Sequence, residues 1–179
     1  MTASPDGSRR MVTGLFRDGG DAERAFRACV ERGYEIGEVN VVMSEGTRQR
    51  LLAGDGEVAA LLARKKAEGG ELGGPAGGRI GILVSVFAAV GAALALPALG
   101  FVVAGPIAAA LAGAGAAGLA AGLVGALGDW GIPEDRIRAY EAGIREGGIL
   151  MMVEVRTDED ARHVEQQWQA IGGRDIQCC

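Results

Sequence analysis

Residues 79–129 have the sequence RIGILVSVFAAVGAALALPALGFVVAGPIAAALAGAGAAGLAAGLVGALGD, in which the charged residues lie only at the two ends. An α-helix rises about 1.5 Å per residue and the hydrocarbon core of a bilayer is about 30 Å thick. Residues 80–103 and 106–127 are therefore each long enough to cross it as a helix. Gly105 and Pro106 separate the two runs and have the composition of a turn. The segment predicts a two-helix, glycine- and alanine-rich apolar hairpin.

The second predicted helix carries its glycines at helical spacing. Gly115, Gly118, Gly122 and Gly125 fall on one face, and leucines fall on another. Small residues let two helices approach closely, so we expect these glycines to form a helix-packing and oligomer surface. The alternative is a hairpin buried in the core of a soluble oligomer, but neither helix has the polar stripe that soluble helices usually show.

The first part of the chain, residues 1–46, predicts a strand–helix–strand unit. Residues 10–16 have the composition of a strand, and residues 21–32 place small and apolar side chains at helical spacing. Gly33 follows, at the position where a glycine commonly ends a helix. Residues 38–43 predict the second strand.

The last part, residues 130–179, predicts a helix, a strand, a helix and a short edge strand. Pro133 suits the first turn of a helix, and residues 149–155 form the most strand-like run of the chain. Thr157 or Asp158 then caps the last helix. Each half of the sheet is therefore expected to contain a strand–helix–strand unit.

Between these parts, residues 47–78 form a helical and then glycine-rich linker, and residues 79–129 form the hairpin. The predicted fold is α+β: a four-stranded, ferredoxin-like (split βαβ) sheet with helices on one face, interrupted by the apolar hairpin. Because both halves of the sheet must meet on one side of a bilayer, the number of crossings must be even. Two crossings satisfy that condition.

Composition excludes several classes of function. The formal net charge of −5 and the pI near 5.0 argue against nucleic acid as a partner, because a phosphate-binding surface needs a basic field. Three cysteines do not make a balanced disulfide framework, which favours a reducing compartment. The first residues contain no apolar signal run, so we expect both termini to lie in the cytoplasm.

The residues and patterns that could indicate catalysis or cofactor binding do not lie in the sequence context that these functions require. His163 is the single histidine and is expected near the solvent face of the last helix, while Cys178 and Cys179 favour a dispensable tail. A GxGxxG pattern at residues 113–118 lies inside the charge-free segment and does not follow a strand as a dinucleotide site requires. We predict no catalytic residue, metal or cofactor, and we can name no small-molecule ligand.

The chain resembles bacterial general stress proteins of the YflT type in two blocks and in its glycine-zipper segment. The matching residues are Met11 to Phe16, Gly33, Tyr34, and Val39 to Ser44 in the first block, and Gly131 to Asp135, Tyr140, Glu141, and Gly143 to Leu150 in the second. The resemblance implies a bacterial, membrane-associated, stress-linked protein and brings no established catalytic residues. The linker at residues 47–78 and the terminal cysteine pair depart from the family pattern.

These observations lead to three hypotheses. The first is a non-enzymatic, homo-oligomeric stress protein anchored in the bacterial inner membrane by its glycine-zipper hairpin, with a lipid bilayer as partner. The second is a soluble, cytoplasmic self-assembling structural or cargo-type protein whose hairpins form the oligomer core. A third, a small-molecule-sensing regulatory domain, rests on analogy with other split βαβ folds.

Overall fold

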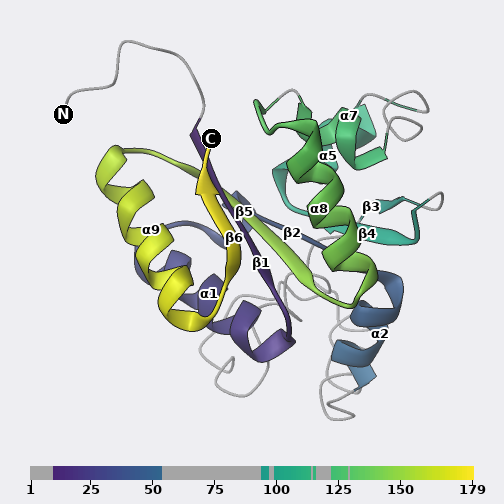
Figure 1. Ribbon diagram of the computed structural model, residues 1–179, viewed down its shortest axis with the longest axis horizontal. Helices are drawn as coiled ribbons and strands as arrows, with labels where there is room; N and C mark the ends of the chain where they lie inside the picture. Colours follow the sequence, from purple (N-terminus) through teal and green to yellow (C-terminus); the bar gives the residue numbers. More distant parts are fainter. Residues whose placement is uncertain (1–9, 54–93, 97–98, 114, 116–121, 129) are drawn as a thin grey trace, which may run out of the picture.

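The computed structural model describes residues 10–53, 94–96, 99–113, 115, 122–128 and 130–179. The fold is α+β, with one antiparallel sheet of six strands in the order β3-β4-β2-β5-β1-β6 (Figure 1). The strands are β1 (Arg10–Phe16), β2 (Val39–Ser44), β3 (Leu94–Leu96), β4 (Phe101–Ala104), β5 (Ile149–Val155) and β6 (Arg174–Cys178). The helices are α1 (Gly19–Glu31), α2 (Glu45–Ala53), α5 (Pro106–Gly113), α7 (Gly122–Gly128), α8 (Glu134–Arg145) and α9 (Asp158–Ile171), with a 3-10 turn η1 (Ile36–Glu38).

Strand β5, from the C-terminal part of the chain, lies between β1 and β2 of the N-terminal part. It pairs along its whole length with β1, and on its other side with β2, where Val39 lies opposite Val153. Strand β1 also pairs with β6, so the C-terminal strand forms one edge (Figure 1). Both strand–helix–strand units predicted from the sequence therefore contribute to one sheet.

Helices cover both faces of the sheet, so the prediction of helices on one face is wrong. Val12 and Phe16 of β1 pack with α1 and α9 on one face, whereas Met11 and Leu15 pack with α5, α7 and α8 on the other. Side chains alternate between the two faces along a strand, and here both sets are apolar and buried. A sheet with two apolar faces needs a helical layer on each.

The helices α1 and α9 begin where their capping residues predict. The Asp18 side chain accepts a hydrogen bond from the Asp21 backbone N–H at 2.8 Å, and Thr157 does the same for Asp160 at 3.1 Å. Each cap satisfies one of the backbone donors that the first turn leaves unpaired. Between the two alternatives left open by the sequence, Thr157 is therefore the cap of α9.

The prediction that residues 80–103 form one long helix is wrong over its second half. Residues 94–96 and 101–104 are the strands β3 and β4, and β4 pairs with β2 from Ser44 opposite Phe101 to Val41 opposite Ala104. An aromatic residue followed by two valines favours a strand, and the exposed edge of β2 supplies the hydrogen-bonding partner. The sheet is therefore larger than the predicted four strands. Residues 80–93 lie outside the described part of the chain.

The prediction of an uninterrupted helix over residues 106–127 is also wrong. Helix α5 ends at Gly113 and α7 begins at Gly122. Gly115 and Gly122 have φ angles of +65° and +64°, in the left-handed region that glycine enters at little cost and that a right-handed helix does not contain. Among the described residues, the helices all lack the combination of length and apolar composition that a membrane crossing needs.

Candidate functional site

The turn predicted at Gly105 and Pro106 is present, but it joins a strand to a helix instead of two helices. Gly105 has a φ angle of +106°, and a Cβ atom there would lie 2.8 Å from the carbonyl oxygen of Val39. The buried Asn40 side chain accepts a hydrogen bond from the Ile107 N–H at 2.8 Å and donates one to the Met152 carbonyl at 3.4 Å. Asn40 thus ties the start of α5 to the sheet.

Helices α5 and α7 together present an outer surface without charge. Their inner sides bury Ile107, Leu111, Leu123 and Leu127 against the sheet and α8. Their exposed residues are all alanine, glycine or proline. We call all of these except Pro106 the α5–α7 surface: Ala109, Ala110, Ala112, Gly113, Gly125 and Gly128. A helix that faces water normally carries polar side chains there, whereas small apolar residues allow another helix to approach closely.

The structure does not bring the four predicted packing glycines together on one helix. Gly125 lies exposed within α7, but Gly115 and Gly122 adopt left-handed conformations at breaks in the predicted helix. Gly118 lies outside the described residues. The small-residue surface is therefore built mainly by the alanines of α5, which the predicted glycine face did not include.

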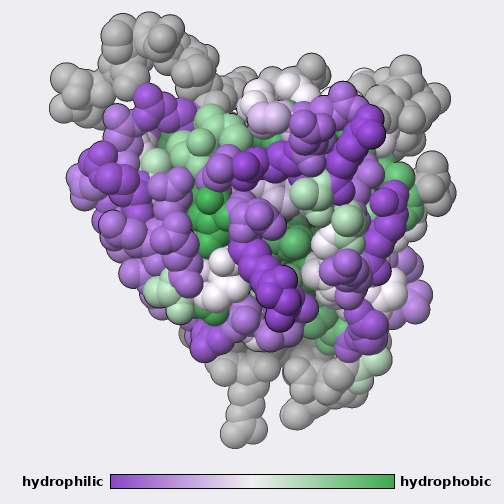
Figure 2. All heavy atoms as spheres, viewed as in Figure 1, coloured by the Kyte–Doolittle hydropathy of each residue, from purple (hydrophilic) through white to green (hydrophobic). Residues whose placement is uncertain are grey.

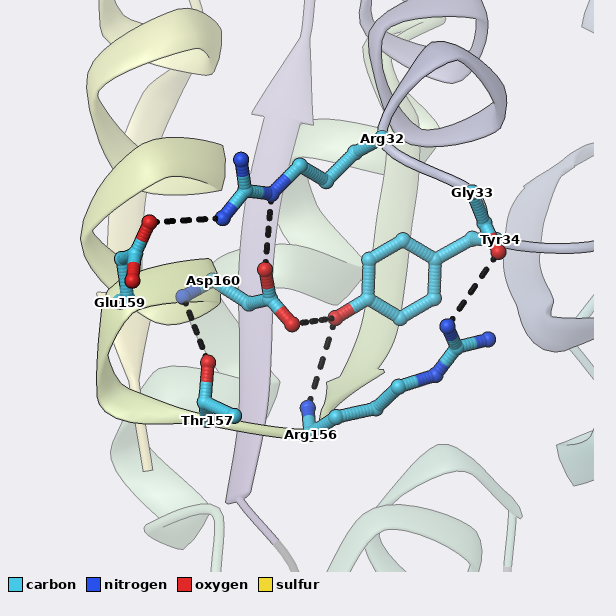
Figure 3. Close-up of polar contacts among 7 residues, drawn as sticks. All are labelled: Arg32, Gly33, Tyr34, Arg156, Thr157, Glu159 and Asp160. Atoms are coloured by element: carbon cyan, nitrogen blue, oxygen red, sulfur yellow. Dashed lines mark hydrogen bonds and ion pairs between the residues drawn. The ribbon is translucent and has the colours of Figure 1, made fainter. Parts of the chain in front are cut away.

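A polar network joins the connection between α1 and β2 to the connection between β5 and α9 (Figure 3). Arg32 donates from Nε to Asp160 Oδ1 at 2.8 Å, and the Tyr34 hydroxyl donates to Asp160 Oδ2 at 3.3 Å. The Arg156 backbone N–H donates to that hydroxyl at 3.4 Å, and the Arg156 guanidinium carbon lies 4.6 Å from the centre of the Tyr34 ring. The network fixes the two connections to each other at one end of the sheet.

The charges of this network suit a structural role. Burial raises the pKa of Tyr34 to about 12, so its hydroxyl stays protonated at neutral pH. Burial also opposes the charged form of Asp160, but the hydrogen bond and charge of Arg32 together with the hydrogen bonds from Tyr34 and Thr157 outweigh it and lower the pKa of that carboxyl. A general acid or base works best with a pKa near the operating pH. Neither Tyr34 nor Asp160 is tuned in that direction.

A cavity of about 290 Å³ lies beside this network, on the sheet face covered by α5 and α8. It is lined by Glu38, Asn40, Pro106, Trp130, Glu154, Val155 and Arg156. Trp130 is half-buried at this cavity. Two acids line the cavity, Glu38 directly before β2 and Glu154 near the end of β5, and only the assembled sheet brings them to one cavity.

The remaining reactive side chains do not assemble into a catalytic or metal site in the described part of the chain. Burial raises the pKa of Cys29 to about 12 and also raises the pKa values of the half-buried Cys178 and Cys179. Such thiols carry little of the thiolate that a nucleophile needs. His163 is partly exposed on α9. Within the described residues, histidine, cysteine and acidic side chains form no cluster of three or more that would hold a metal ion.

Comparison of the chain with protein-family models, with curated proteins and with solved structures found no match. Its function therefore has to follow from the features of its own surface.

Proposed function

We propose that the protein is a non-enzymatic, self-associating protein that attaches to the bacterial inner membrane through its charge-free segment, as its resemblance to general stress proteins of the YflT type implies. The observation that carries this proposal is the α5–α7 surface, whose residues are all alanine or glycine. This surface belongs to the run between Arg79 and Asp129, which contains no charged residue.

The energetic argument concerns what the surface lacks. A charged side chain at the centre of a bilayer costs about 2.5–3.5 kcal/mol on the biological insertion scale, and a charge buried between protein surfaces also has to be desolvated. Burying the α5–α7 surface incurs neither cost, because the surface has no charged side chain. Its alanines and glycines also let the backbone of a neighbouring helix come close, which strengthens van der Waals packing between copies.

A second candidate is self-assembly without lipid. Helices α5 and α7 have only eight and seven residues, whereas a transmembrane helix needs about 20. Folded as they are against the sheet, the two helices fit contact with another copy. In this alternative the α5–α7 surface forms the core of a soluble, cytoplasmic assembly.

We further infer a ferredoxin-like core within the larger sheet. The strands β2-β5-β1-β6 are consecutive in the sheet, and α1 and α9 cover the same face of it. Each helix connects two strands of this group, β1 to β2 and β5 to β6. In this interpretation β3 and β4 are additions beyond β2, and α5, α7 and α8 form an added layer on the opposite face.

The test compares matched pairs of charges on two helices. Ala109→Glu with Ala112→Glu places two carboxylates on the α5–α7 surface, and Ala139→Glu with Ala142→Glu places two at the same spacing on the exposed side of α8. Membranes from expressing cells are washed with alkaline carbonate, and the protein of each fraction is sized in detergent and without it.

The proposal predicts that the wild type and the α8 variant stay in the washed membrane as oligomers, and that the α5 variant is released. A wild-type protein recovered as a large soluble particle that only the α5 variant disrupts would establish the second candidate. Equal behaviour of all three proteins would overturn the role of the α5–α7 surface in both.

A further inference from the structure

Two carboxylates, those of Glu38 and Glu154, line the cavity. Glu38 is the last residue of η1, directly before β2, and Glu154 follows Val153, which lies opposite Val39 of β2. Glu154 lies two residues after Met152, which packs on the face of the sheet covered by α5, α7 and α8, and side chains alternate along a strand. Two carboxylates that line one cavity repel each other, so positive charge nearby stabilises them.

Arg156 supplies that charge to Glu38. Its Nη2 atom donates to both oxygens of the Glu38 carboxylate, at 2.8 and 3.1 Å. The Glu35 backbone N–H donates to the same carboxylate at 2.7 Å, and this bond together with the bond from Arg156 lowers the pKa of Glu38. Arg156 also donates from Nη1 to the Gly33 carbonyl at 3.3 Å, so its guanidinium is directed toward the connection between α1 and β2 (Figure 3).

Among the described residues, Glu154 has no such positive partner. Its side chain is exposed, and it forms no hydrogen bond or ion pair with the other described residues. The two carboxylates and one guanidinium that line the cavity leave one net negative charge. Pro106 and the half-buried Trp130 provide apolar walls beside it.

We infer that this cavity binds a small organic ammonium ion. Glu154 offers the counter-charge, and an indole is the aromatic group that attracts cations most strongly when they lie within about 6 Å of the ring centre. The volume of about 290 Å³ is at the lower end of the range of ligand pockets, about 300–1,000 Å³, which suits a ligand of a few carbon atoms.

The donor set favours an organic cation over a metal ion. Calcium takes about six to eight oxygen ligands, several of them from carboxylates. The described residues provide no group of three acidic, histidine or cysteine side chains that could hold a metal ion, and one of the two carboxylates in the cavity is already bound by Arg156. An ammonium ion needs only one carboxylate and an apolar wall.

Tryptophan fluorescence of the full-length protein tests this inference. The chain has two tryptophans, and Trp168 is fully buried in the core under α1 and α9, so a change in emission on ligand binding reports Trp130. The probes are choline, its uncharged isostere 3,3-dimethylbutan-1-ol, and calcium chloride. Isothermal titration calorimetry measures the same binding without relying on an optical signal.

Choline is expected to change the emission and to bind in the millimolar range or tighter, and the uncharged isostere is expected to bind at least about tenfold more weakly. Glu154→Gln removes the counter-charge and should weaken choline binding by about tenfold or more. The matched control is Glu31→Gln, an exposed acid at the end of α1 on the other face of the sheet, which should bind choline as the wild type does.

Four results would overturn the inference. Equal binding of choline and its isostere would show an apolar site without charge recognition, and an unchanged affinity in Glu154→Gln would place the ligand elsewhere. Binding of calcium but not of choline would make the cavity a metal site. Absence of both heat and emission change with choline would likewise refute it, whatever the outcome of the membrane and assembly experiments.

Discussion

Helices on the two faces of the sheet differ in their outer surfaces. Helices α1 and α9 bury one side and carry charged residues on the other, and in Figure 2 hydrophilic side chains cover the region of α9. Helices α5 and α7 lie on the opposite face and bury their inner sides equally well, but their exposed sides carry no charge. Both layers stabilise the fold, and within the described part of the chain the α5–α7 surface is the uncharged one that we propose contacts a bilayer or another copy.

The largest expected effect tests the first layer. Trp168 is fully buried, packs edge-to-face on Phe16 with 5.5 Å between ring centres, and donates from Nε1 to the Ala25 carbonyl at 3.2 Å. Trp168→Ala leaves a cavity and removes the hydrogen bond to Ala25, so we expect a loss of about 3–5 kcal/mol in the free energy of unfolding. Urea unfolding followed by far-UV circular dichroism measures it. A loss under about 1 kcal/mol would contradict the packing described for this layer.

The next effect tests how the second layer is attached. Gly105→Ala forces a Cβ atom to within 2.8 Å of the Val39 carbonyl oxygen at a φ angle of +106°. Strain and overpacking should together lower the free energy of unfolding by about 2–4 kcal/mol.

Gly131→Ala is the matched control for that change. Gly131 also has a positive φ angle, +77°, but a Cβ atom there meets nothing within 4 Å. Only the conformational cost of about 1–2 kcal/mol then remains. Equal losses in the two variants would mean that the close approach of Gly105 to β2 does not hold α5 in place.

The buried Asn40 provides an intermediate effect in the same layer. Asn40→Ala leaves the Ile107 N–H and the Met152 carbonyl without their partner, at an expected cost of about 1–3 kcal/mol. Amide hydrogen exchange locates the effect, because the first turn of α5 should lose protection while α9 keeps it. Uniform loss of protection over both layers would show that the two do not respond separately.

The smallest effect is a pH dependence of the network that holds α9. The pKa of Asp160 is lowered in the folded protein, so its contribution is fully present above the unfolded value of about 3.9 and is lost as the pH falls through the lower folded value. Asp160→Asn should therefore be less stable than the wild type at neutral pH, and the difference should vanish on acidification. Glu31→Gln should show no such difference, and a difference for Asp160→Asn that grows toward low pH would contradict the assignment.

The layer with charged outer sides is also the one that the sequence predicts well. Helical spacing of apolar residues, the caps at Asp18 and Thr157, and the glycines after each helix all lie within a few residues of the ends they mark. Strands β1 and β5 follow from their composition at the bounds now observed. These signals are local, so they predict the elements without knowledge of the tertiary structure.

The α5–α7 layer and the cavity depend on contacts between distant parts of the chain. A run in which nearly every residue is apolar has no period, so it does not distinguish a bilayer from a protein interior or a strand from a helix. The pairing of β4 with β2, the role of Asn40 at the start of α5, and the presence of Glu38 and Glu154 in one cavity all require the sheet to be assembled. Local propensity contains none of this information.

The most direct test of the central claim is whether the α5–α7 surface is covered in washed membranes. In a background with Cys178→Ser and Cys179→Ser, Ala109→Cys places a thiol on α5 and Ala139→Cys places one on α8, both at exposed positions. Membranes opened to the reagent on both sides are treated with a charged maleimide, and labelling is read by mass spectrometry. The proposal predicts rapid labelling of Ala139→Cys and protection of Ala109→Cys, with protection lost in denaturant. Equal labelling of the two before denaturation would show that the charge-free surface faces water, and the account of its function would fail.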